Sequence, residues 1–585
     1  MPENHNQYQA RLVSLRKEIK KHGLSGYILP RTDEFQSEFL APYAERLKWL
    51  TAFTGSAASA IILEGVAVVL SDSRYTIQLK QEVPGDLYQT ENIMDVSVGD
   101  WLFEHAPEGA KVGYDMWLYT PKQIDAIREK LEERDVELIP LQVNLIDQIW
   151  LNQPDKPQES VILFPQQVAG MSSLEKRREI STLIKEAGCK ACLLTVSDSI
   201  CWLLNVRGND IGYSPLVLSY VLLYEDATVD WFVDLDKLSP DVLNALGDDI
   251  RIVDLNEMET HIESVRSSKI WTDRASCPVW FTHHLNDIYD QKDPCITPKS
   301  IKTTEEQSAI RETHIHDGVA LVRFLKWLDD VACNEQLSEL SVERKLEEFR
   351  ALHPSYIRTS FPTIAGFGAH GAIVHYRANE QSNRMIEEGG LLLVDSGGQY
   401  HWGTTDITRT VSIGEPTLEM KENYTRVLKG HIALACAQFK KGTIGKDVDP
   451  LARASLKEVG LDYGHGTGHG VGCYLCVHED AANISPRGEV AFENGMLISN
   501  EPGYYKEGEY GIRIENLVLV QEDTVNGMLY FDTVSLAPLD KDLIAEDMLT
   551  NLEIQWLSAY HSDILEKLSP YLSEDERGWL ENQKL

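Results

Sequence analysis

Five short polar segments between residues 391 and 516 restrict the possible folds of this chain more than any other feature. Each contains an acidic residue or a histidine, and the first and the last adjoin an apolar run that is typical of a buried strand. A single carboxylate of this kind is usually an ordinary surface acid, but that explanation does not suit five segments together. The segments are LLLVDSGG (391–398), GTTDITRT (403–410), HGTGHGVG (465–472), SNEPGYY (499–505) and GIRIEN (511–516).

The spacing of these residues indicates that they meet in space. Asp395 ends an apolar strand and Asp406 follows eleven residues later, so two adjacent antiparallel strands would bring both carboxylates to one point. In the third segment, alternate glycines leave space around His465 and His469 for a metal and a substrate. A phosphate-binding loop does not fit, because neither the dinucleotide spacing nor a trailing Lys-Ser/Thr pair is present.

Four carboxylates and an imidazole form a donor set that consists mainly of oxygen. Oxygen-rich sites favour Mn²⁺ or Mg²⁺-like ions, whereas cysteine ligands would favour Zn²⁺. Carboxylates can also bridge two cations about 3.5–4 Å apart. The segments therefore predict a metal centre with room for a pair of cations.

The chain before this region repeats one plan. A helix predicted over 8–22 ends at Gly23 and is followed by a strand at 27–29; a second helix over 174–187 ends at Gly188 and is followed by a strand at 191–195. Each block then carries a Trp-Leu pair with a glycine six positions after the tryptophan, at Trp49 and at Trp202. This order of elements favours a duplicated α/β unit.

Two polar stretches that contain proline, at 152–157 and 293–299, predict boundaries between domains. After the second, Thr304-x-x-Gln307 is typical of a capping box that opens a long helix. We interpret His314 and His316 on this helix as surface residues. Two helices end the chain, and Ser573-x-x-Glu576 opens the second of them.

Size and charge exclude several classes of protein. The 585 residues are too many for a single core, and a net charge of −36 argues against nucleic acid as a partner. We expect no membrane span and no signal peptide, because apolar runs of the required length are missing from the sequence. The nine cysteines suit reduced thiols of the cytoplasm. Two CxxC pairs, at 189–192 and 473–476, could form a zinc site, but we interpret Cys189 as a buried free thiol.

The five segments resemble the metal-binding motifs of the pita-bread metallopeptidases, the family of methionine aminopeptidase, prolidase, creatinase and aminopeptidase P. The layout of the chain is similar to that of the three-domain cytosolic aminopeptidase P subgroup. Its motifs are matched by WLLNVRGND (202–210), GAIVHY (371–376), VLKGHIALA (427–435), LDYGHGTGHGVG (461–472) and EPGYY (501–505). His370 departs from the pattern, since the family more often has asparagine at this position.

This resemblance implies an α/β (α+β) fold of three domains. Two creatinase-like N-terminal α/β domains would cover residues 1–155 and 156–303. A pita-bread metallopeptidase catalytic domain would cover residues 304–585.

The resemblance also implies the metal ligands, which fall on Asp395, Asp406, His469, Glu501 and Glu515. Asp406 and Glu515 would bridge two divalent ions, His469 and Glu501 would complete one ion, and Asp395 the other. We expect Mn²⁺, with Co²⁺ or Zn²⁺ as alternatives. A hydroxide held between the ions would attack the scissile carbonyl, and Glu501 would act as general base.

Further site residues follow from the same resemblance. His375, His465 and His478 are assigned catalytic and substrate-binding roles. His478 is the candidate for stabilising the oxyanion or protonating the leaving proline nitrogen, and His375 for contacting the substrate beyond proline. Tyr505 and Arg513 are expected to bind substrate or to support the metal ligands.

The implied function is that of an Xaa-Pro aminopeptidase, which hydrolyses the bond between the first residue of a peptide and a penultimate proline. The family further implies a cytoplasmic homodimer. Two alternatives remain open: a prolidase, which cleaves only X–Pro dipeptides, and a pita-bread protein without catalysis that serves as a binding module. The complete ligand set argues against the binding module, and the two preceding domains favour the aminopeptidase.

Overall fold

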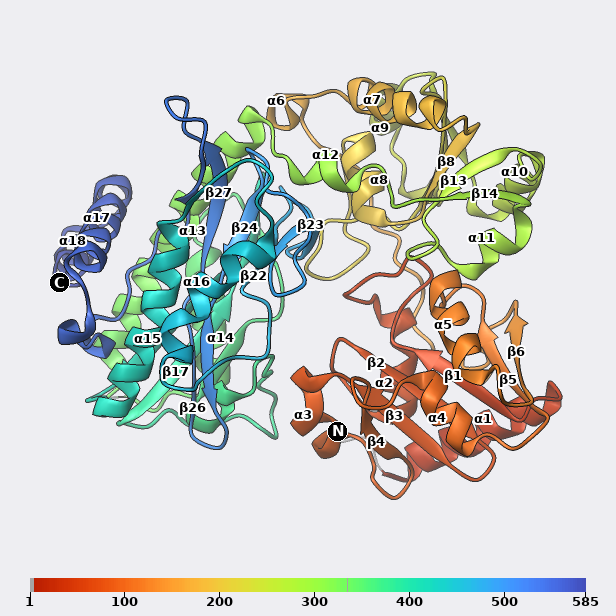
Figure 1. Cartoon of the computed structure of the whole chain (residues 1–585), viewed down its shortest axis with the longest axis horizontal. Coiled ribbons are helices and arrows are strands. Elements are labelled where there is room, and N and C mark those ends of the chain that lie inside the picture. The colour runs from red at the N-terminus through yellow and green to blue at the C-terminus, as the bar shows by residue number, and fades with distance from the viewer. Residues whose placement is uncertain (1–4, 334, 585) are drawn as a thin grey trace. The chain divides into compact units, whose positions relative to one another are not determined.

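The computed structural model describes residues 5–333 and 335–584 and divides the chain into two compact units (Figure 1). Unit 1 comprises Met1–Phe164, Ser172–Gly212 and Leu216–Cys295, and unit 2 comprises Pro165–Met171, Tyr213–Pro215 and Ile296–Leu585. The three domains expected from the sequence stay a prediction. Within the described residues, none of the helices combines the length and hydrophobicity that a bilayer crossing needs.

Unit 1 contains two six-stranded sheets, in the orders β4-β3-β2-β1-β5-β6 and β12-β11-β10-β8-β13-β14. The first consists of β1 (Gly26–Pro30), β2 (Ala58–Leu63), β3 (Ala67–Ser71), β4 (Gln89–Asn92), β5 (Ala110–Asp115) and β6 (Val136–Leu141). The second consists of β8 (Ala191–Leu194), β10 (Tyr220–Tyr224), β11 (Val229–Phe232), β12 (Ile250–Val253), β13 (Lys269–Thr272) and β14 (Asp287–Asp290).

The two sheets have the same topology. In each, the first strand pairs with an antiparallel neighbour on one side and with a parallel neighbour on the other. The outer pairs β3–β4 and β11–β12, and likewise β5–β6 and β13–β14, are parallel. This correspondence confirms the repeated α/β plan that the sequence predicts.

Helices precede the first strand of each sheet, as expected. On α1 (His5–Lys21), the buried residues Leu12, Leu15 and Ile19 form one apolar face. Gly23 follows with φ +69°, a left-handed conformation that ends the helix at little cost for glycine. The corresponding helix of the second block is α7 (Ser173–Glu186). The two Trp-Leu pairs lie on α2 (Arg46–Thr51) and α8 (Ser197–Leu204).

Unit 2 is built on antiparallel strands. A three-stranded sheet has the order β16-β17-β20, and a six-stranded sheet has the order β21-β28-β27-β24-β22-β23. The strands of the first are β16 (Ile364–Phe367), β17 (Gly390–Ser396) and β20 (Ile407–Ile413). Those of the second are β21 (Gln438–Phe439), β22 (Gly468–Gly470), β23 (Glu479–Ile484), β24 (Leu497–Asn500), β27 (Asn516–Glu522) and β28 (Leu529–Thr533), and β25 (Gly503–Lys506) pairs separately with β26 (Tyr510–Arg513).

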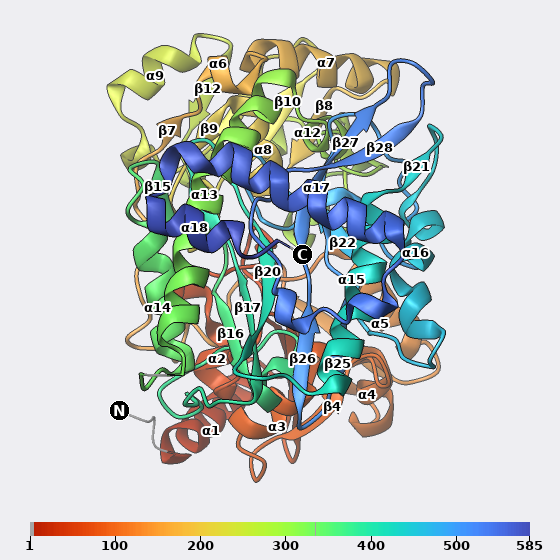
Figure 2. The same cartoon turned by 90° about the vertical axis from the view of Figure 1, so that its left-hand side faces the viewer.

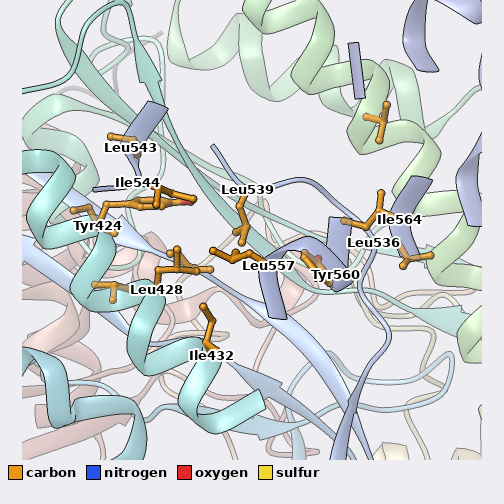
Figure 3. Close-up of a cluster of buried hydrophobic side chains, with 14 of the residues drawn as sticks. Tyr424, Leu428, Ile432, Leu536, Leu539, Leu543, Ile544, Leu557, Tyr560 and Ile564 are labelled. Carbon is orange, nitrogen blue, oxygen red and sulfur yellow. The ribbon is translucent and has the colours of Figure 1, made fainter. Parts of the chain in front are cut away.

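Helices pack against these sheets, and apolar residues of the helices form part of the hydrophobic core. Figure 2 shows α17 and α18 side by side, passing in front of β17 and β20. Buried apolar residues of α15, α17 and the chain between β28 and α17 form one cluster (Figure 3). The main helices are α13 (Thr304–Val331), α14 (Glu339–Arg350), α15 (Leu418–Ala435), α16 (Gly445–Lys457), α17 (Asn551–Leu568) and α18 (Glu574–Glu581).

Two details of α13 differ from the expectation. The capping box lies one residue earlier: Thr303 Oγ1 accepts from Glu306 N, and the Glu306 carboxylate accepts from Thr303 N. A charged carboxylate caps an N-terminus better than an amide does.

His314 is buried, not exposed, and its pKa is lowered by burial. Its Nδ1 donates to Ile310 O at 2.8 Å, a bond within the helix that satisfies one ring nitrogen away from solvent.

The cysteines are free thiols. Cys189 and Cys192 are buried in unit 1, and burial raises the pKa of both thiols. Among the described residues, no cysteine belongs to a cluster of three candidate metal ligands. The interpretation of Cys189 as a buried thiol is therefore confirmed.

α15 packs closely against α16 at Gly430, where there is no room for a side chain. A Cβ atom on Gly430 would lie 2.0 Å from Ala452 O, so Gly430→Ala should destabilise unit 2 by about 1–3 kcal/mol or more. Gly578 on α18 is the matched control, because a Cβ atom added there would have no neighbouring atom within 4 Å. Gly578→Ala should leave stability unchanged or raise it by about 0.5–1 kcal/mol. Thermal unfolding of both variants checks this, and equal melting temperatures would contradict it.

Candidate metal centre

The two aspartates of the predicted centre come from neighbouring antiparallel strands. β17 pairs with β20 so that Asp395 lies opposite Thr408 and Ser396 lies opposite Ile407. Asp406 directly precedes β20. The antiparallel arrangement expected from their spacing is confirmed, and both carboxylates are buried.

The other three residues come from the six-stranded sheet. His469 lies on β22, Glu501 directly follows β24, and Glu515 directly precedes β27. These strands are neighbours, with Asn500 opposite Asn516. Thr408 ties the two sheets together, because its Oγ1 donates to Glu515 Oε2 at 2.8 Å and its carbonyl accepts from Glu515 N at 3.2 Å.

The potential ligand atoms converge. One such atom from each of Asp406, His469 and Glu515 lies within 4.8 Å of the others. His469 Nε2 is 3.5 Å from Asp406 Oδ2 and 3.5 Å from Glu501 Oε1. His469 Nδ1 faces Gly470 O at 2.9 Å and must donate to it, which leaves the lone pair of the neutral ring on Nε2, toward the carboxylates.

Burial of several carboxylates at one point disfavours their charged forms. The pKa values of Asp406 and Glu515 are raised well above their usual range, first by burial and then by neighbouring carboxylates. Burial raises the pKa of Glu501 to about 7, and Asp395 adds to this shift while Arg513 opposes it. Divalent cations would relieve this repulsion.

A metal pair fits this arrangement on structural grounds. Asp395 Oδ1 is buried and has no hydrogen-bond partner among the described residues, which is costly unless a ligand occupies it. The donor set is four carboxylates and one imidazole, and carboxylates can bridge two cations. Asp395, Asp406, His469, Glu501 and Glu515 could therefore hold two divalent ions.

Arg513 connects Asp395 to two further predicted site residues. Its Nη2 donates to Asp395 Oδ2 at 2.6 Å, and its Nη1 donates to Tyr505 Oη at 2.7 Å. His465 Nδ1 donates to Gly466 O at 2.7 Å, so its Nε2 accepts from the Tyr505 hydroxyl at 2.8 Å. Burial and the charge of Arg513 lower the pKa of His465 to about 3, which keeps this imidazole neutral at pH 7.

The structure also places His478 and His375. The His478 ring lies perpendicular to that of His469, with 4.5 Å between centroids, and its charge lowers the pKa of both Asp406 and Glu501. His375 follows Val374, whose carbonyl accepts from Arg513 Nη2 at 3.5 Å. Their roles toward a substrate stay predictions.

Sequence reasoning missed Glu339, a fully buried residue at the start of α14. Its Oε1 accepts from Phe367 N at 2.9 Å and from His370 Nδ1 at 2.8 Å, and its Oε2 accepts from Tyr376 Oη at 2.8 Å and from Arg384 N at 2.9 Å. The carboxylate thus holds both ends of the loop that carries His375. Nothing in its local sequence distinguishes it from an ordinary acid in the first turn of a helix.

The hydrogen bond to Glu339 shows how a histidine fits at position 370, where the family more often has asparagine. The imidazole donates to Glu339 and stacks on Tyr376 with 4.4 Å between ring centroids. An asparagine at this position also carries an N–H donor. His370 therefore contributes to the support of the loop.

Comparisons with known proteins cover nearly the whole chain. The model of metallopeptidase family M24 matches residues 308–522, and the model of the C-terminal region of peptidase M24 matches residues 527–584. Two models of the creatinase/prolidase N-terminal domain match residues 11–149 and 152–306.

Similar proteins extend over the same length. The probable Xaa-Pro aminopeptidase P of Talaromyces marneffei is 35% identical over 98% of this chain and 91% of its own length. The Xaa-Pro aminopeptidase 1 of Dictyostelium discoideum is 35% identical over 98% of this chain and 96% of its own. A crystal structure of X-prolyl aminopeptidase from Caenorhabditis elegans, a cytosolic enzyme with a di-nuclear active site, superposes with a TM-score of 0.94 at 30% identity, covering 99% of this chain and 100% of that one.

The raised carboxyl pKa values predict that metal binding releases protons. A cation binds the deprotonated form of a carboxylate. At a pH below the raised pKa values the carboxyl groups are protonated, so Mn²⁺ must displace these protons. The affinity for Mn²⁺ should therefore rise with pH. Because the pKa of Glu501 is about 7, proton release should be larger at pH 6 than at pH 8. Calorimetric titration of Mn²⁺ in buffers of different ionisation enthalpy measures this release. An affinity that does not change between pH 6 and pH 8 would contradict the predicted coupling.

The Glu339 cluster predicts a difference between two substitutions at one position. His370→Ala removes a donor from a buried carboxylate and should cost about 1–3 kcal/mol of stability. His370→Asn keeps an N–H donor and should cost less. The melting temperatures of the two variants distinguish them, and an equal or larger loss in His370→Asn would refute the supporting role.

Proposed function

The chain belongs to metallopeptidase family M24, and we propose that it removes the N-terminal residue from peptides whose second residue is proline. Relatives named Xaa-Pro aminopeptidase match it over nearly its full length. The observation that carries the proposal is a cluster of potential ligand atoms: one atom each of Asp406, His469 and Glu515 lies within 4.8 Å of the others, and Glu501 Oε1 lies 3.5 Å from His469 Nε2.

We propose the following assignment of the ligands. Asp406 and Glu515 would hold both of two divalent ions, His469 and Glu501 would complete one ion, and Asp395 would complete the other. The mainly oxygen donor set favours Mn²⁺, with Co²⁺ or Zn²⁺ as alternatives. When bound, the cations lower the pKa of water from about 15.7 toward 7 and polarise the scissile carbonyl.

Glu501 is suited to accept the proton of the attacking water. With cations beside it the carboxylate would be deprotonated and able to accept a proton. Ser499 Oγ donates to Glu501 Oε1 at 3.1 Å. This bond orients the carboxylate at the end of β24.

Proline imposes a particular demand on the leaving group. The X–Pro nitrogen carries no hydrogen, so it must gain a proton when the peptide bond breaks. His478 lies beside His469 and is the residue that we assign to this proton or to the developing oxyanion. His375 and His465 would contact the substrate around proline, and Tyr505 and Arg513 would fix the position of His465.

The acidic surroundings of the centre suit a substrate with a free amino terminus. A protonated α-amine would be attracted to the carboxylates of the centre, and this attraction would restrict cleavage to the first residue. Recognition of proline would depend on the shape of its ring and on the flanking carbonyls, because its nitrogen offers no hydrogen bond.

We also propose a three-domain organisation and a cellular setting. Domains over 1–155, 156–303 and 304–585 are supported by the ranges of the family models. A cytoplasmic location is supported by the likeness to the cytosolic nematode enzyme. A homodimer is proposed on the family resemblance.

Paired peptide assays test the function. With Mn²⁺ present, an Arg-Pro-Pro tripeptide should lose its first residue, whereas cleavage of Gly-Pro alone would identify a prolidase.

Asp406→Asn and Glu515→Gln should each lower turnover by at least about 10²-fold, because each removes a charged bridging ligand. Melting temperatures serve as the folding control. Full activity in either folded variant would refute the bridging assignment.

A further inference from the structure

The helix α17 lies beyond the last proposed metal ligand and beyond the family model for residues 308–522. Tyr560 of this helix is nevertheless buried. Its hydroxyl hydrogen-bonds to Arg409 and to Asn516, the residue that follows Glu515. A chain of four side chains makes the connection: Arg409, Asn516, His431 and Tyr560.

Arg409 is the first of these side chains. It lies on β20, three residues after Asp406, and is buried. Its Nη1 donates to Glu515 O at 2.6 Å and to Thr408 O at 2.9 Å. The guanidinium therefore holds the main chain of one proposed ligand directly.

Asn516 directly follows Glu515 and is held on both sides. Its Oδ1 accepts from Arg409 Nη2 at 2.8 Å, and its Nδ2 donates to His431 Nε2 at 3.1 Å. The side chain is fully buried. Water cannot reach its polar atoms, so both of these bonds are needed to satisfy them.

His431 on α15 joins the two glutamate-bearing strands. Its Nδ1 donates to Asn500 O at 3.1 Å, and its own carbonyl accepts from Asn500 Nδ2 at 3.0 Å. Asn500 directly precedes Glu501. Burial and the charge of Arg409 lower the pKa of His431 to about 3, so the ring is neutral and can donate to one asparagine and accept from the other.

Tyr560 closes the network from α17. Its hydroxyl accepts from Arg409 Nη2 at 3.0 Å. It lies 3.2 Å from Asn516 Oδ1 and 3.0 Å from both Ser535 O and Ala537 O, any of which can accept its single proton. Figure 3 shows Tyr560 beside Leu557 in the buried cluster that α17 shares with α15.

We infer that α17 is a positioning element of the metal centre, in which Tyr560 fixes Arg409 and Asn516 and thereby the position of Glu515. This inference rests on the proposed function, because it takes Glu515 as a metal ligand. Residues that hydrogen-bond directly to a metal ligand typically contribute about 10–100-fold in metal affinity. Tyr560 touches no ligand carboxylate itself, so its effect passes through Arg409 and Asn516.

The chain offers a matched control in Tyr424 on α15. Tyr424 belongs to the same buried cluster, and its hydroxyl has no hydrogen-bond partner among the described residues. Tyr424→Phe and Tyr560→Phe thus remove the same atom from the same core. They differ in whether that atom belongs to the network behind Glu515.

The test is a Mn²⁺ titration of the full chain after removal of metal with a chelator. Tyr560→Phe should weaken Mn²⁺ binding by about 10-fold, whereas Tyr424→Phe should stay within about twofold of the parent protein. Activity of Tyr560→Phe on a prolyl tripeptide should recover when excess Mn²⁺ is added. A role limited to folding would lower the melting temperature without such recovery.

Equal Mn²⁺ affinity in Tyr560→Phe and the parent protein would overturn the inference. If Tyr560→Phe does not fold, Asn516→Ser replaces it, because this variant loses the contacts to Arg409, His431 and Tyr560, and unchanged Mn²⁺ affinity in it would again overturn the inference. A parent protein that binds no Mn²⁺ would refute the proposed metal centre, and with it the basis of the inference. The two failures are therefore distinguishable.

Discussion

Repulsion among buried carboxylates is the constraint on which the rest of unit 2 depends. Burial, and then the charges of neighbouring carboxylates, raise the pKa values of Asp406 and Glu515 well above their usual range, and burial raises that of Glu501 to about 7. Such an arrangement is stable only with protons or cations between the oxygens. Divalent cations would relieve this repulsion, which is why we propose that the site binds them.

The fold resists this repulsion by fixing the backbone of the proposed ligands as well as their carboxylates. Paired strands place Asp395 and Asp406, and the register of β24 and β27 places Glu501 and Glu515. Behind the glutamates, His431 bonds to Asn500 and Asn516, while Arg409 bonds to Glu515 O. Glu339 does the equivalent for the loop that carries His375. These contacts leave the ligand oxygens available to a metal.

Much of this arrangement could be predicted from local patterns in the sequence. The spacing of Asp395 and Asp406 indicated adjacent antiparallel strands, and the repeated helix–strand order indicated the twin sheets of unit 1. The supporting residues could not be predicted in this way. Glu339, His431 and Tyr560 look like ordinary helix residues, and most of their partners lie far away in sequence, 85 residues in the case of His431 and Asn516. His314 is buried where the sequence predicts a surface residue, because a helical pattern does not reveal what covers a given face.

Diffraction at the manganese absorption edge, from crystals of the protein supplied with Mn²⁺, tests the central claim most directly. The account predicts two anomalous peaks about 3.5–4 Å apart, with the carboxylates of Asp406 and Glu515 between them and Asp395 and His469 on opposite sides. A single peak, or peaks that are not in contact with these residues, would contradict it.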